Sequence, residues 1–192
     1  MKKLFKLLFL AAGAVAGAAC EDKDQGSMHT TCPVLDPEQT VVEYIDTVIQ
    51  ESRALGLEAE EFASILCGKQ WRDEVYVQYD ADWTNLKVIY ATINGEQLFP
   101  MAPGFGCLYT FEADGTGFDH FDTVQSEGGA ITWSWDPVAL VLDIDYADGR
   151  GLTLHIQSFS QEDFVGYEHR IFSEPEQHRI HQYLFKGLGG PL

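Results

Sequence analysis

Residues 107–117 have the sequence CLYTFEADGTG, in which apolar and polar side chains alternate and then give way to Asp114-Gly115. Cys107, Tyr109 and Phe111 occupy every second position, and this spacing places them on one face of a β-strand. An Asp-Gly pair supplies the positive φ angle that a tight hairpin needs. The stretch therefore predicts a strand with one apolar face, followed by a hairpin turn.

The same alternation recurs between Trp71 and Lys186, and the pair Asp148-Gly149 marks a second turn. About eight such strands, joined mostly by short loops, predict an antiparallel up-and-down β-barrel or a β-sandwich. Consecutive hairpins favour the barrel, because closure removes exposed strand edges. We therefore assign residues 68–192 to a barrel domain. Its further apolar rows are Val75, Val77 and Tyr79; Ile131, Trp133 and Trp135; Leu140, Leu142, Ile144 and Tyr146; and Leu152, Leu154 and Ile156.

Two neighbouring segments depart from this alternation. Residues 82–93 carry apolar residues near helical spacing, beginning at Trp83, but they also contain the β-rich stretch Val88-Ile89-Tyr90. We expect a short helix there, capped by Asp82. Residues 95–106 contain several glycines and prolines and predict a long loop. A loop of this length in a compact domain is often a binding loop or a lid.

A helical segment is expected to precede the barrel, over residues 36–67. Asp36 can cap the first helix, and Pro37 suits its first position. Apolar side chains then recur at helical spacing, at Val41, Ile45, Val48 and Ile49. A second helical piece is expected over residues 58–67. We expect the apolar stripe to pack on the core of the domain, and the alternative is a groove for a partner.

Residues 1–19 predict an export signal, because three lysines precede an uncharged apolar run of thirteen residues, 7–19. That run is too short to span a bilayer, which needs about 20 residues, and it ends in small residues. Gly17-Ala18-Ala19-Cys20 resembles a bacterial lipobox, in which the cysteine is lipidated and becomes the mature N-terminus, although Gly17 stands where Leu, Val or Ile is usual. We expect lipid, such as palmitate, on Cys20 to anchor the protein to a membrane. The alternative is ordinary signal cleavage after Ala19.

Residues 20–35 predict a flexible tether between the anchor and the folded domain. The acidic cluster Glu21-Asp22-Lys23-Asp24 resembles the surface-export signal of Bacteroidota lipoproteins, and the alternative is a merely solvated tether. We expect an outer-membrane or cell-surface location, with the periplasmic side as the alternative. Removal of the leader and its three lysines takes the formal net charge from −18 to −21. No basic surface is then left for nucleic acid, and membrane attachment depends on the lipid rather than on a basic face.

Three stretches resemble the lipocalin-like domains of Bacteroidota lipoproteins. They are residues 66–71 (LCGKQW), residues 108–117 (LYTFEADGTG) and residues 131–136 (ITWSWD). Gly68 and Trp71 are separated by two residues, where the lipocalin pattern has one. The resemblance covers about residues 65–186 and implies a small β-barrel with a central cavity. It carries no family-wide catalytic residues.

The chain lacks the motifs of common enzyme and metal sites. It contains no Gly-x-Ser-x-Gly, no His-Glu-x-x-His and no phosphate-binding loop, so we expect neither catalysis nor a cofactor. No two cysteines stand at Cys-x-x-Cys spacing, and the three that would remain after acylation of Cys20 are an odd number. Cys67 and Cys107 are the two inside the folded region. His178 and His181 stand three apart in an expected strand and therefore point to opposite faces, so we expect no metal site.

The apolar rows leave two functions open. In an eight-stranded barrel the interior either is filled by side chains or holds one small ligand. We expect a small hydrophobic ligand in a cavity lined by Tyr109, Phe111, Trp133, Trp135, Leu142, Ile144 and Leu154. The alternative is a structural or interaction protein with a filled core, acting through residues 95–106 or the N-terminal helix.

Overall fold

The computed structural model describes residues 36–100, 107–121, 128–173 and 176–189. Contacts divide the chain into two units, residues 1–34 and 35–192. The expected leader, the anchor Cys20 and the tether lie outside the described residues. Within the part that is described, no helix is both long enough and apolar enough to cross a membrane.

Two helices precede the strands, as the sequence predicts. Helix α1 spans Pro37–Ala54, and after a 3₁₀ turn (Ala59–Glu61) helix α2 spans Phe62–Leu66. The Asp36 carboxylate accepts a hydrogen bond from the Glu38 backbone N–H at 3.0 Å, which confirms the expected cap. The strands are β1 (Gln70–Asp80), β2 (Lys87–Ile93), β3 (Glu96–Phe99), β4 (Cys107–Phe111), β5 (Thr116–Phe121), β6 (Gly129–Asp136), β7 (Val141–Tyr146), β8 (Gly151–Phe159), β9 (Asp163–Ser173) and β10 (Glu176–Leu188).

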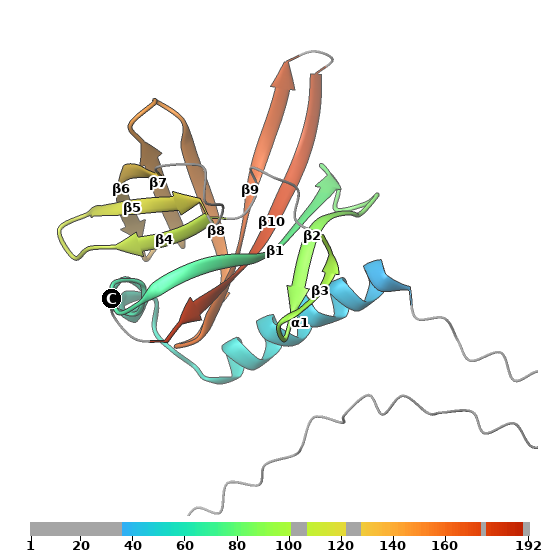
Figure 1. The fold of residues 1–192 in the computed structure, drawn as a ribbon, viewed down its shortest axis with the longest axis horizontal. Coiled ribbons are helices and arrows are strands. Elements are labelled where there is room, and N and C mark those ends of the chain that lie inside the picture. The colour runs from blue at the N-terminus through green and yellow to red at the C-terminus, as the bar shows by residue number, and fades with distance from the viewer. Residues whose placement is uncertain (1–35, 101–106, 122–127, 174–175, 190–192) are drawn as a thin grey trace, which may run out of the picture. The chain divides into compact units, whose positions relative to one another are not determined.

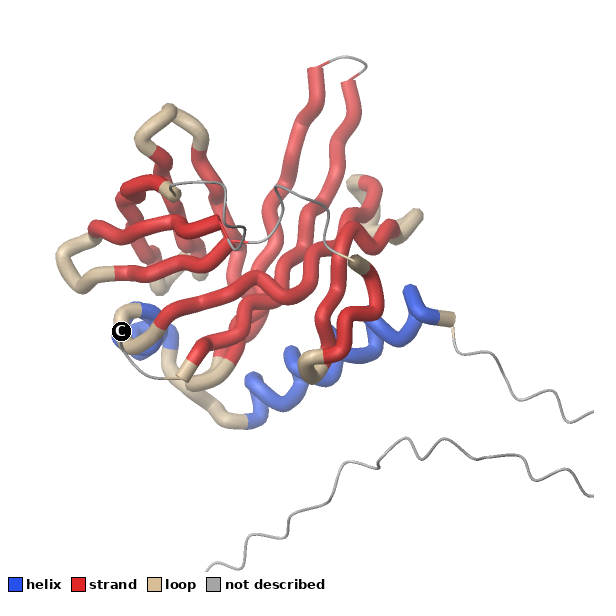
Figure 2. The backbone as a smooth tube through the Cα atoms, viewed as in Figure 1, coloured by secondary structure: helices blue, strands red, loops and turns tan. Residues whose placement is uncertain are grey.

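Eight of these strands close into an antiparallel barrel (Figures 1 and 2). Strands β4 to β10 pair in chain order, and β1 completes the ring by pairing with β10 on one edge and β4 on the other. Beyond its pairing with β4, the same edge of β1 pairs with β2, so the β2–β3 hairpin branches away from the ring. The expected up-and-down barrel is therefore confirmed.

The expectation of a helix over residues 82–93 is wrong. Trp83 and Asn85 have φ angles of +64° and +49°, which no right-handed helix contains, and residues 87–93 form β2 instead. Asp82 caps a turn rather than a helix, because its carboxylate accepts from the backbone N–H of Thr84 at 3.2 Å. The β-rich stretch at 88–90 thus outweighs the helical spacing.

The long loop expected over residues 95–106 is also shorter than predicted. Its first part forms β3, which pairs with β2 through a turn at Asn94-Gly95, where both φ angles are positive. Two successive positive φ angles give the turn that best matches the twist of a two-stranded hairpin. Residues 101–106 lie outside the described part of the chain.

A register shift in β1 gives the fold two apolar clusters rather than one. The shift falls between Asp73 and Val75, so that Trp71 contributes to the barrel interior while Val75 and Val77 belong to a second cluster. A bulge of this kind reverses which side chains face each side of the strand. The continuous inward row expected for β1 is therefore interrupted.

Helix α1 covers the outward side chains of β1. Val41, Ile45, Val48 and Ile49 pack with Val75, Val77, Val88, Ala91, Val165 and Leu184. The C-terminal turn of the helix is also tied to the barrel, since Ser52 Oγ donates to Asp163 Oδ1 at 2.9 Å. The expectation that the apolar stripe packs on its own domain is confirmed, and this stripe is not left free for a partner.

Candidate functional site

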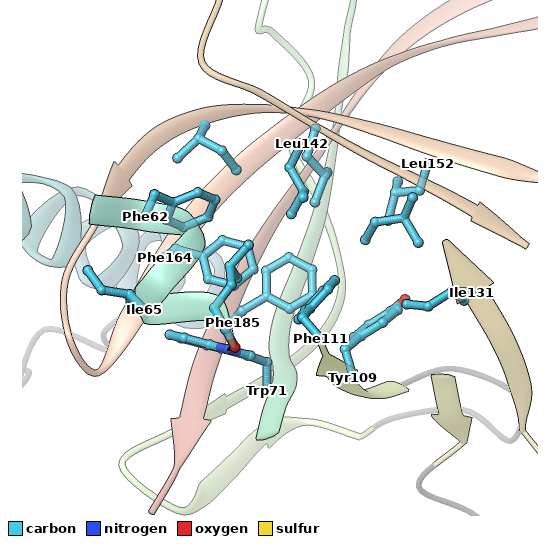
Figure 3. Close-up of a cluster of buried hydrophobic side chains, with 14 residues drawn as sticks. Phe62, Ile65, Trp71, Tyr109, Phe111, Ile131, Leu142, Leu152, Phe164 and Phe185 are labelled. Atoms are coloured by element: carbon cyan, nitrogen blue, oxygen red, sulfur yellow. Dashed lines mark hydrogen bonds between the residues drawn. The ribbon is translucent and has the colours of Figure 1, made fainter. Parts of the chain in front are cut away.

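One end of the barrel is filled with apolar side chains (Figure 3). Phe62 from α2 lies within ring-contact distance of Trp135 (4.6 Å), Phe159 (5.0 Å) and Phe164 (5.5 Å). Trp71 is fully buried, and its ring nitrogen donates to the Leu66 carbonyl oxygen at 3.0 Å. The extra residue between Gly68 and Trp71 therefore does not displace the tryptophan from the barrel base.

Most side chains predicted to line a ligand cavity lie in this filled region. Phe111, Leu142, Ile144 and Leu154 are buried members of the interior cluster, and Trp133 and Trp135 pack against it while partly exposed. Trp135 Nε1 donates to the Ala59 carbonyl oxygen at 2.9 Å, so this ring is held by the 3₁₀ turn. Tyr109 is the member of the predicted set that also lines the cavity described next.

A cavity of about 360 Å³ occupies the barrel interior beyond the filled end. We call it the tyrosine cavity, because five tyrosines from five different strands contribute to its wall. Burial raises the pKa of each of these phenols, so their hydroxyls stay protonated at neutral pH. The lining comprises Tyr76, Tyr90, Tyr109, Tyr146 and Tyr183, with Asp73, Asp119, Arg150, Arg170, Cys107, Gly151, Leu152 and Phe185.

Asp73 on β1 is the most strongly perturbed acid of the cavity. Tyr90 Oη donates to its Oδ2 at 2.6 Å, and the Cys107 backbone N–H donates to its Oδ1 at 2.7 Å. Burial nevertheless outweighs these bonds and, with some repulsion from Asp119, raises the pKa of the carboxyl to about 7. Asp73 therefore changes charge near neutral pH.

We expect this carboxyl to make the protein less stable as pH rises. Because its pKa is raised on folding, the folded protein keeps a proton between about pH 4 and pH 7 that the unfolded chain has lost. Between about pH 5 and pH 8 the unfolding free energy should fall by roughly 2 to 3 kcal/mol more in the wild type than in Asp73→Asn. Urea denaturation of both proteins at the two pH values measures this difference. Parallel pH profiles would contradict the assignment.

Asp119 on β5 lies in the same cavity and is only 3% exposed. Its Oδ1 has no hydrogen-bond partner among the described residues. Burial raises the pKa of this carboxyl as well. Its backbone fits closely against Gly128, where φ is +58° and a Cβ atom would lie 2.2 Å from the Asp119 carbonyl oxygen. Glycine is therefore required beside this acid.

A buried polar network borders the cavity on β9 and β10. Glu168 Oε1 accepts from Arg170 Nε at 2.7 Å and from Tyr183 Oη at 2.8 Å. His181 is 2% exposed; its Nδ1 lies 3.6 Å from the same carboxylate oxygen and 2.9 Å from Tyr76 Oη. The network fixes the positions of two cavity tyrosines.

The remaining polar groups of the cavity are also held by their neighbours. The hydroxyls of Tyr109 and Tyr146 are hydrogen-bonded at 3.0 Å, and the Arg150 guanidinium lies 5.0 Å from the Tyr146 ring centroid. Arg150 itself forms an ion pair with Asp148 at 2.7 Å. Burial raises the pKa of the Cys107 thiol far above its usual range, so this cysteine is not an activated nucleophile.

Several polar residues of this site were not predicted from the sequence. Asp73, Asp119 and Glu168 each stand in a strand-forming stretch, and Asp119 follows Gly117 at the spacing of one strand face. That two-residue spacing could have indicated that Asp119 faces the barrel interior. Cys67 and Cys107 are free thiols rather than a disulfide. Among the described residues, no group of three or more His, Cys, Asp or Glu side chains could hold a metal ion.

Comparisons with known proteins give structural similarities but no sequence match. No protein-family model matches the sequence, and no curated protein matches it either. The structure is similar to that of insecticyanin from the tobacco hornworm Manduca sexta, with a TM-score of 0.34 and 12% identity, over 64% of this chain and 61% of that chain. This chain thus spans less than two thirds of the insecticyanin chain. The fold assignment therefore rests on the closed strand pairing observed in this chain itself.

Proposed function

We propose that this protein is a non-catalytic carrier or sensor that binds one small amphipathic molecule in the tyrosine cavity. The observation that carries the proposal is the contrast between the two parts of the barrel interior, one filled with apolar side chains and the other hollow. A volume of about 360 Å³ falls at the lower end of the range for small-molecule pockets. The ligand expected is therefore a small molecule of a few rings at most.

The wall chemistry favours a ligand with both apolar and polar parts. Tyrosine rings offer apolar faces for packing, and their hydroxyls offer hydrogen bonds at the rim. Leu152 and Phe185 add apolar surface, whereas Asp73 and Asp119 add acceptors. The cavity predicted from the sequence was lined by aromatic and aliphatic side chains, whereas the lining here also includes acids and arginines.

Binding of a neutral apolar dye tests this proposal. The Cys20→Ser protein, titrated with N-phenyl-1-naphthylamine, should show saturable fluorescence enhancement with one site per chain. Native mass spectrometry of the same preparation should show one bound molecule per chain. If neither saturable dye binding nor a bound molecule is found, the carrier proposal is refuted.

We further propose that the protein is exported and held at an outer membrane or cell surface by lipid on Cys20. The lipobox-like residues 17–20 and the acidic residues after them support this proposal. Several acyl chains would hold the domain stably, whereas one chain holds a protein only marginally.

Replacement of Cys20 by serine should abolish metabolic labelling with palmitate and move the protein from the membrane fraction to the soluble one. The same replacement at Cys67, which is a free thiol in the folded domain, is the matched control and should leave labelling unchanged. Labelling that survives Cys20→Ser would refute the anchor.

A further inference from the structure

Two carboxylates face the tyrosine cavity from strands that are distant in sequence. Asp73 lies on β1 and Asp119 on β5, and both line the cavity while being at most 6% exposed. The two Asp73 oxygens each accept a hydrogen bond from the protein. Asp119 Oδ1 accepts none within the described residues, although a buried acceptor normally has a partner. This oxygen is therefore available to accept a hydrogen bond from a ligand in the cavity.

The two cavity arginines form their direct ion pairs with other acids, although Arg150 lies near enough to Asp119 to lower the pKa of that carboxyl. Arg150 is engaged by Asp148 and Arg170 by Glu168, each at 2.7 Å. Neither Asp148 nor Glu168 is part of the cavity lining. Each arginine is thus paired with its own acid, and above about pH 7, where Asp73 is ionised, Asp73 and Asp119 carry negative charge that neither arginine pairs directly.

The aromatic walls are suited to positive charge as well. Tyr76 stacks on Tyr183 with ring centroids 4.7 Å apart, and it meets Tyr90 edge-on at 5.6 Å. The faces of such rings attract cations, and the attraction is stronger where water is excluded. Carboxylates and tyrosine faces together recognise an ammonium group carried on an apolar body.

Building on the binding function proposed above, we propose that the ligand is a small organic cation, a primary ammonium on an aromatic or apolar body. The ammonium donates a hydrogen bond to Asp119 Oδ1 and lies within the field of Asp73. The apolar body packs against the tyrosine rings, Leu152 and Phe185. A neutral ligand would leave the excess negative charge uncompensated, and an anionic ligand would be repelled by it.

Three ligands that share one body but differ in charge test this inference. Bound N-phenyl-1-naphthylamine is displaced from the Cys20→Ser protein by 2-phenylethylamine, 2-phenylethanol or phenylacetate. Measurements at about pH 8 keep the amine protonated and Asp73 ionised. The amine should displace the dye at concentrations at least about tenfold lower than the alcohol, and phenylacetate should be the weakest.

Two single substitutions locate the effect at the cavity. In Asp119→Asn, amine binding should weaken about tenfold relative to the alcohol measured in the same variant, so that the two compounds bind alike. Asp145→Asn removes the same charge from an exposed position on β7 and should leave both affinities unchanged. Thermal unfolding of each variant reports that it is folded, and the comparison of the three ligands on the Cys20→Ser protein needs no further variant.

The outcomes separate this inference from the function on which it rests. If the dye does not bind, the proposed binding function fails. If the dye binds but the amine has no advantage over the alcohol, or phenylacetate binds best, the ligand is not a cation and only this inference fails. An amine preference that survives Asp119→Asn would overturn the role assigned to that residue.

Discussion

Replacing Trp71 by alanine is expected to lower the free energy of unfolding by about 4 kcal/mol, the range found for large aromatic side chains in protein cores. Trp71 is fully buried where β1 meets both β4 and β10. Its ring contacts Phe164 at 5.0 Å, and its N–H satisfies the Leu66 carbonyl at the end of α2. The substitution therefore leaves a cavity at the filled end and an unpaired carbonyl together.

Urea denaturation of Trp71→Ala and the wild type measures this loss. Val138→Ala is the control, because Val138 is 92% exposed in the turn between β6 and β7 and its replacement should change stability by less than about 0.5 kcal/mol. Trp71→Phe should fall between the two, since it keeps ring packing and loses the hydrogen bond. A loss below about 1 kcal/mol for Trp71→Ala would contradict the closed barrel base.

Replacing Cys107 by phenylalanine is expected to weaken dye binding by at least about tenfold, through steric filling of the tyrosine cavity. Cys107 lines the cavity from the first residue of β4. A phenyl ring at this position occupies space that the ligand needs. Because added bulk in a packed site can cost about 1 to 3 kcal/mol, thermal unfolding of the variant is measured alongside binding.

The matched control is Leu108→Phe, which adds a ring at the next residue of the same strand. Leu108 is absent from the cavity wall, and successive side chains of a strand point to opposite faces. Dye affinity should therefore be unchanged in Leu108→Phe. Equal loss of binding in both variants, or full binding in Cys107→Phe, would place the dye elsewhere.

Local patterns in the sequence predict much of this fold. The alternation over residues 107–111 and 152–156 marks the inward side chains correctly, because Tyr109, Phe111 and Leu154 are buried in the barrel. The helix that begins at Pro37 also follows from its cap and its apolar stripe. These features depend on neighbours a few residues apart, which a single sequence displays.

Other features depend on contacts that the local pattern does not contain. The bulge after Asp73 reverses the facing of β1, so Val75 and Val77 pack against α1 rather than in the barrel. The site follows from closure of the ring, which brings Asp73 and Asp119 together across 46 residues of sequence. Neither acid has a local sequence feature that indicates that the other lies in the same cavity.

The most direct test of the central claim is a map of backbone amide chemical shifts in the Cys20→Ser protein, with and without bound N-phenyl-1-naphthylamine. If the dye binds in the tyrosine cavity, the largest changes should fall on residues around it, at Tyr109, Asp119, Tyr146 and Leu152. Amides of α1, such as those of Val42 and Asp46, should not move. Changes confined to α1 or to the filled end, or no changes at saturating dye, would contradict a binding function for this cavity.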